Sequence, residues 1–151
     1  MSVLNWGNPK IEIASGATAA AEGATYTEIA KGLIKQDSAK LDTTDGDTKE
    51  ALNEGGETVD KRVLASKYSF TFQVFVTDSF TDPITDVNGV VTANYSVRLT
   101  PEDTTKKGFK MPYCSVSKKT TWSSSDGSLI EFTFTGLKPT TGNILQAYTQ
   151  A

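Results

Sequence analysis

Residues 68–76 read YSFTFQVFV, and this stretch decides the fold class. Every second position is apolar: Tyr68, Phe70, Phe72, Val74 and Val76. The positions between and after them are polar except for Phe75: Ser69, Thr71, Gln73 and Thr77. A repeat of two residues places the two sets on opposite faces of an extended chain. The pattern therefore predicts a β-strand with one face on a core and the other toward water or a partner.

The same alternation recurs at 91–99 (VTANYSVRL) and 130–135 (IEFTFT). Between them, the run 123–128 (SSSDGS) has the composition of a turn, so it predicts a hairpin that joins a strand near 114–122 to one near 129–135. Shorter strand candidates are 10–14 and 27–34; Gly32 interrupts the second and suggests a bulge or a bend.

Helical patterns are sparse. Asp47 and Glu50 have the spacing of a helix-capping pair ahead of Ala51-Leu52, but Gly55-Gly56 would end such a helix early and fits a turn with positive φ. Residues 143–148 fit either a last helical turn or a last strand. The prediction is one mainly-β domain over 1–151, built as a two-sheet sandwich or a partly closed barrel of about six to eight strands with little helix.

The composition argues against most enzyme classes. The chain of 151 residues contains no histidine, which removes the usual general base, the usual partner of a nucleophilic serine or cysteine, and the commonest zinc ligand. Carboxylate-only chemistry stays open. Cys114 is the single cysteine, so no internal disulfide forms, and a small buried side chain is its expected role. We expect a non-enzymatic protein that needs no cofactor and no metal.

The charge and the amino terminus bear on partners and location. The net charge of −3 is not the basic footprint of a nucleic-acid-binding domain. No run approaches the roughly 20 apolar residues that cross a bilayer, and the first residues do not resemble a signal peptide. We expect synthesis in a cytoplasm, with no membrane partner.

Residues 37–60 differ from the rest of the chain. They hold few large apolar side chains and eight acids: Asp37, Asp42, Asp45, Asp47, Glu50, Glu54, Glu57 and Asp60. Only Lys40 and Lys49 oppose them, so this segment carries a charge of −6 while the remaining residues sum to +3. Three interpretations stay open: a solvated loop, a metal-binding loop at Asp42, Asp45 and Asp47, or a long arm ordered by neighbouring subunits.

Two further groups of charged residues have alternative interpretations. Asp78, Asp82, Asp86 and Asn88 precede Gly89 and are typical of turns, with a weaker calcium alternative. A basic surface is predicted from five lysines: Lys106, Lys107, Lys110, Lys118 and Lys119. It is either solvated or complementary to the acidic segment in head-to-tail association. Trp6 and Trp122 are expected to pack inside the fold, with an interface role as the alternative for Trp6.

Several runs together resemble the tail tube proteins (major tail proteins) of long-tailed bacteriophages: 52–60 (LNEGGETVD), 68–76 (YSFTFQVFV), 86–91 (DVNGVV) and 97–103 (VRLTPED). The hairpin 121–128 (TWSSSDGS) and the end 137–142 (LKPTTG) are similar to a variant found in phages and prophages of Bacteroides-type bacteria.

The resemblance implies a virion protein whose hexameric rings stack into a hollow tail tube, assembled in the cytoplasm of a host bacterium. In that family two sheets pack as a sandwich, usually with a flanking helix, and a long arm reaches the next ring. DNA passes through without specific binding, and an acidic segment suits the arm or the lumen. The alternative function is another structural β module, such as a capsid decoration protein or an immunoglobulin-like adhesion domain.

Overall fold

The computed structural model describes residues 7–78 and 80–149. Within them the chain is mainly β, as predicted, and its only helical element is the 3-10 turn η1 (Lys31–Leu33). The strands are β1 (Lys10–Ser15), β2 (Tyr26–Ile29), β3 (Lys40–Thr44), β4 (Thr48–Leu52), β5 (Thr58–Val63), β6 (Lys67–Phe75), β7 (Tyr95–Thr100), β8 (Gly108–Ser123), β9 (Gly127–Gly136) and β10 (Gln146–Tyr148).

Eight strands form one antiparallel sheet in the order β2-β1-β7-β8-β9-β6-β3, with β10 also paired to β8. The long strand β8 joins the two halves of this sheet. Residues up to Cys114 pair with β7, whereas residues from Cys114 onward pair with β9. A strand that passes from one half to the other lets a single sheet fold over its own core.

The core lies between these halves. On one side, adjacent positions of β6 and β9 bring Phe70 opposite Phe134 and Phe72 opposite Phe132, and all four rings are buried. The same buried cluster includes Ile13 of β1, together with residues of β7 and β8. The alternation from Tyr68 to Val74 and at 130–135 therefore supplies the apolar face of this core, as predicted. Val76, expected on the same face, lies beyond the end of β6 and is 39% exposed.

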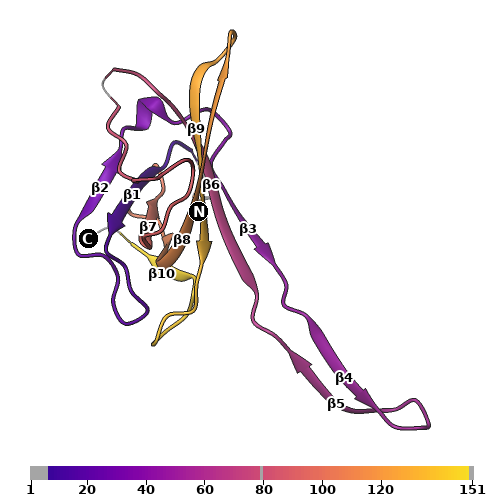
Figure 1. Cartoon of the computed structure of the whole chain (residues 1–151). Helices are drawn as coiled ribbons and strands as arrows, with labels where there is room; N and C mark the ends of the chain where they lie inside the picture. The colour runs from indigo at the N-terminus through magenta and orange to yellow at the C-terminus, as the bar shows by residue number, and fades with distance from the viewer. Residues whose placement is uncertain (1–6, 79, 150–151) are drawn as a thin grey trace.

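A second, two-stranded sheet extends away from this body. The hairpin begins as β3 paired with β6, and beyond Thr44 and Lys67 it continues as β4 paired with β5. Figure 1 shows this extension pointing away from the other strands. We call residues 45–66 the arm, and the rest of the described chain the body.

The sheet is open rather than closed into a barrel. Among residues 7–78 and 80–149, its two outermost strands, β2 and β3, each pair along one edge only, so each leaves an edge that no described strand pairs. The predicted sandwich is thus produced by one folded sheet, and the long acidic arm of the predicted fold is present as a hairpin.

Several local expectations need correction. The helix suggested at Asp47–Leu52 is wrong because this run pairs with β5 as strand β4. Val91 and Ala93 lie before β7, which begins at Tyr95. The interruption at Gly32 is the turn η1 rather than a bulge within a strand. Of the two alternatives at 143–148, the strand is the one observed, as β10.

Candidate functional site

The tip of the arm is a turn that its own side chains close. The Asn53 carbonyl accepts a hydrogen bond from the Gly56 N–H, and the Asn53 side-chain oxygen accepts one from the Glu57 N–H at 3.0 Å. Gly56 has a φ of 82°, which glycine adopts without strain. The predicted turn with positive φ is therefore confirmed at Gly56.

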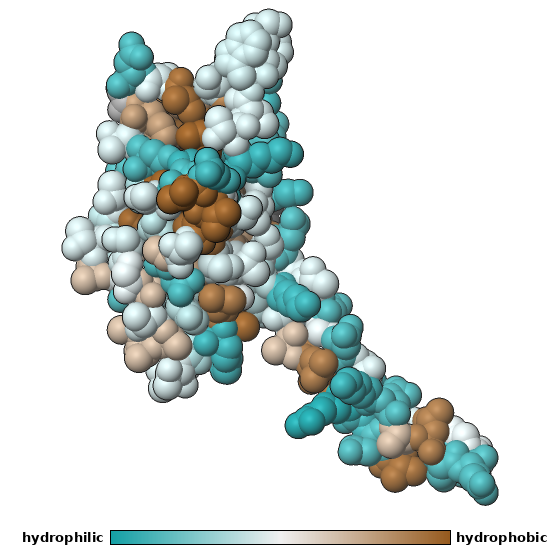
Figure 2. Space-filling view, in the orientation of Figure 1, coloured by the Kyte–Doolittle hydropathy of each residue, from teal (hydrophilic) through white to brown (hydrophobic). Residues whose placement is uncertain are grey.

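Every residue of β4 and β5 is exposed, including large apolar ones. Leu52 keeps 59%, Val59 68% and Val63 65% of their surfaces accessible. Lys61 and Val63 share one face of the hairpin, whereas Val59 is the unpaired residue of a β-bulge, because Thr58 is opposite Leu52 and Asp60 is opposite Ala51. The arm thus presents an apolar surface to solvent, visible as brown patches in Figure 2.

The predicted acidic residues are spread along this hairpin. Asp42 lies on β3, 3.5 Å from the Lys40 ammonium, whereas the other six lie on the arm: Asp45, Asp47, Glu50, Glu54, Glu57 and Asp60. The tip at 50–60 contains four acids and no base. Among residues 7–78 and 80–149, no three His, Cys, Asp or Glu side chains converge as a metal site, so Asp42, Asp45 and Asp47 do not gather around a common point.

A close backbone contact lies where the arm leaves the body. A Cβ atom at Gly46 would overlap the carbonyl oxygen of Leu64, and Leu64 N–H donates to the Asp47 carbonyl at 2.8 Å. Only glycine fits this approach without moving the facing strand. Gly46 therefore helps to set how the arm leaves the body.

The five predicted basic residues do not form one patch. Lys106 and Lys107 lie in the loop before β8, and Lys110 near its start is 3.6 Å from Glu22. Lys118 and Lys119 lie eight or nine residues further along β8, roughly 25 Å away at about 3.3 Å per residue.

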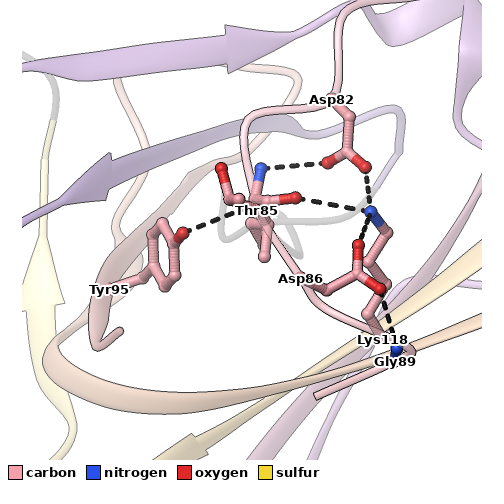
Figure 3. Close-up of polar contacts among 7 residues, drawn as sticks. Asp82, Thr85, Asp86, Gly89, Tyr95 and Lys118 are labelled. Atoms are coloured by element: carbon pink, nitrogen blue, oxygen red, sulfur yellow. Dashed lines mark hydrogen bonds and ion pairs between the residues drawn. The ribbon is translucent and has the colours of Figure 1, made fainter. Parts of the chain in front are cut away.

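Lys118 is committed to contacts within its own chain. Its side chain is only 9% exposed, and its ammonium contacts the carboxylates of Asp82 and Asp86 (2.9 Å to Asp86) and the carbonyl of Ile84 (Figure 3). Burial lowers the pKa of Lys118, but the hydrogen bonds to both carboxylates outweigh it and raise the pKa above its usual value. The cluster fastens the loop 82–89 to β8.

The acidic side of this cluster confirms the turn interpretation. The hydrogen bonds from Lys118 and then from the Gly89 N–H lower the pKa of Asp86. Asp82 accepts from the Ile84 N–H at 2.9 Å, and Asn88 and Gly89 both have positive φ. These aspartates bond nearby backbone and one lysine.

Sequence reasoning missed a groove of about 870 Å³ at the base of the arm. Ile34, Leu41, Phe70, Leu99 and Phe109 contribute apolar surface to it. Its charged lining residues are Lys31, Lys35, Lys40 and Asp37. These residues come from two segments, 31–41 and 99–109, and from β6, and no local motif marks their meeting. We call this surface the lysine groove.

The remaining predicted packing residues have different outcomes. Trp122 was expected inside the fold, but it is 72% exposed, because the β8–β9 hairpin extends beyond the core and nothing in the described chain covers its end. Trp6 lies outside the described residues. Cys114 is fully buried, as expected, and burial raises its pKa to about 12.

A scan of protein-family models finds no match, and neither does a search of curated proteins. Among solved structures, a chain of the PVC sheath-tube complex of an extracellular contractile injection system, in the extended state, is 16% identical, with a TM-score of 0.48. That match covers 92% of this chain and 89% of the other.

A chain of the PVC sheath/tube terminator of such a system, also in the extended state, is 12% identical with a TM-score of 0.47, covering 93% of this chain and 94% of the other. At these values the likeness establishes neither a shared family nor a shared activity. Separately, no helix within 7–78 and 80–149 is long and apolar enough to span a membrane.

Proposed function

We propose that this chain is a non-enzymatic structural subunit that assembles with copies of itself through its arm. In its specific form, the proposal is a phage-type tail tube: 1–151 acts as one unit, the rings are hexameric, and they stack around a channel for DNA within the virion tail. The other partners would be further tail proteins. The sequence resemblance described above motivates this specific form.

The single observation that carries the proposal is the exposure of every residue of β4, β5 and the turn between them. A two-stranded hairpin alone is marginally stable in water. This one adds no buried side chain to offset the entropy of ordering it, and it exposes Leu52, Val59 and Val63. Apolar residues grouped on an extended hairpin are typical of a surface that a partner covers.

The open edges of the main sheet point in the same direction. Within the part of the chain that the structure describes, β2 and β3 end the sheet without a partner strand on their outer side. Unpaired edges invite further strand pairing, and assembly into a closed ring would satisfy them. Sheet edges alone do not choose between a ring and a filament, so the ring rests on the resemblance.

The charge of the arm suits passage of DNA. Residues 45–66 hold six acids against Lys49, Lys61 and Arg62, a net charge of −3, and a negative surface repels the phosphate backbone, whereas a basic lining would bind it in a salt-dependent way. An arm that faces a channel would therefore keep DNA mobile.

Electron microscopy and sedimentation velocity of the purified chain test the proposal. The informative variant replaces residues 45–66 with Asn-Gly, which joins the paired residues Thr44 and Lys67 by a two-residue turn. We expect rings of about six subunits or tubes from the natural chain, and monomers with an unchanged thermal transition from the shortened one.

Two controls make the comparison decisive. Lys49→Ser alters the face of the arm that does not carry Glu50, and it should leave assembly intact. Val59→Ser should weaken assembly. A natural chain that stays monomeric at high concentration would contradict the proposal. Binding to capsid shells without self-association would instead favour a decoration protein.

A further inference from the structure

We infer that the lysine groove of one copy receives the arm tip (50–60) of a second copy. This inference rests on the proposed self-assembly and adds the surface on which the arm docks. It begins from two accessible surfaces of one chain: an exposed apolar and acidic hairpin tip, and an apolar groove with lysines.

The charges of the two surfaces are complementary. The arm tip carries Glu50, Glu54, Glu57 and Asp60 and no base. Three lysines and one aspartate line the groove. Lys35 and Lys40 already form ion pairs with Asp126 (3.4 Å) and Asp42 (3.5 Å), so among residues 7–78 and 80–149 Lys31 is the groove lysine without an ion pair. Opposite charge across an interface steers association and fixes its register.

The apolar parts also match. The groove has aromatic surface in Phe109, whose ring meets Phe70 edge-on at 5.2 Å between centroids, and aliphatic surface in Leu41. Its volume of about 870 Å³ leaves room for side chains such as Leu52 and Val59. Both arm residues are more than half exposed and would lose water on entering it.

The arm cannot fill the groove of its own chain. Leu41 lines the groove and Leu52 lies eleven residues further along an extended hairpin, which is roughly 35 Å at about 3.3 Å per residue. Figure 1 shows the arm pointing away from the body. A second copy is therefore the occupant that carries a matching surface.

This contact is asymmetric, since the arm of one copy meets a different surface on the next. Contacts of this kind form closed rings or continue as filaments, rather than stopping at a dimer. The free edge of β3 starts at Lys40, beside the groove, so a docked hairpin has unpaired backbone next to it.

Disulfide trapping tests the contact directly. One chain carries Leu52→Cys and a second, distinguishable by a tag, carries Ala39→Cys in the groove. Cys114 can stay, because its buried thiol with raised pKa does not react readily. Mixed and oxidised, the two chains should give a covalent heterodimer. Leu52→Cys mixed with Ala20→Cys, in the exposed loop between β1 and β2 and outside the groove, is the matched control.

The outcomes separate this inference from the proposed function, because sedimentation is measured on the same samples. Assemblies that form a disulfide to Ala20→Cys, or none at all, would overturn the groove and leave self-assembly standing. Absence of any assembly would overturn both. A groove cysteine that stays unreactive to maleimide in the arm-shortened monomer would show that the chain fills its own groove, and would also overturn the inference.

A charge exchange gives a second test that needs no cross-link. Lys31→Glu with Lys35→Glu, and separately Glu54→Lys with Glu57→Lys, should each raise the concentration needed for assembly about tenfold. Mixing the two variants should restore assembly between arm and groove of opposite sign. Lys138→Glu, outside the groove, should change little. Failure of the mixture to recover, with both variants folded, would contradict the inference.

Discussion

The body and the arm are built from the same kind of strand pair, yet only the body buries side chains between its strands. In the body, β6 and β9 bury Phe72 against Phe132. In the arm, β4 and β5 have the same antiparallel pairing and bury nothing. The comparison shows that backbone pairing sets the shape of a hairpin, whereas burial of its side chains decides whether the hairpin needs a partner.

The largest expected effect is on the stability of the body. Phe72→Ala removes a fully buried ring from the centre of the core and should lower the free energy of unfolding by about 3–5 kcal/mol. Urea denaturation, followed by far-UV circular dichroism, measures this change. A loss below about 1 kcal/mol would mean that the core is not where the strand alternation places it.

A smaller effect is expected where the body holds a loop. Lys118→Met leaves Asp82 and Asp86 without their cation and should cost about 1–3 kcal/mol. The neighbouring exposed Lys119→Met is the control and should stay within about 0.5 kcal/mol. Equal effects of the two substitutions in denaturation would show that the Lys118 cluster does not fasten the loop 82–89.

The pH dependence of the same cluster should be smaller still. Because the folded-state pKa of Asp86 lies below its unfolded value, its contribution is present above about pH 4 and is lost as the pH falls through the folded pKa. Asp86→Asn should therefore make the free energy of unfolding less dependent on pH below pH 4, without changing its pH dependence near pH 7. If the melting temperature of Asp86→Asn depends on pH below 4 as steeply as that of the natural chain, this prediction is contradicted.

The smallest effect on unfolding is expected in the arm. Val59→Ser alters an exposed side chain and should change the free energy of unfolding of the monomer by no more than about 0.5 kcal/mol. The same substitution should clearly weaken assembly. Sedimentation and denaturation of one sample separate the two, and a large stability loss in the monomer would mean that the arm is already buried.

The body was predictable because its signals are local. Alternation at 68–76 and 130–135 depends only on neighbouring residues, and the turn at Asn88-Gly89 needs only residues that tolerate positive φ. Strand β4 was missed because the spacing of Asp47 and Glu50 also caps a helix; only its pairing with β5 decides between the two. Local propensity is overridden in this way wherever a partner strand is available.

The surfaces were less predictable because they depend on what surrounds them. Trp122 lies an even number of residues after the buried Cys114 and Val116, so the alternation along β8 places it on their face of the strand. The alternation does not show that the core ends before Trp122. The acidic character of the arm follows from composition. The lysine groove joins 31–41 to 99–109, and no spacing rule connects lysines and apolar residues that distant.

The central claim is that neighbouring copies hold the arm. Hydrogen exchange of the arm amides, measured below and above the concentration at which the chain assembles, tests it most directly. We predict rapid exchange at 50–60 in the monomer and strong protection in the assembly, with little change at β6 and β9. Protection of the arm that is already complete in the monomer, or exchange that stays rapid in the assembly, would contradict the claim.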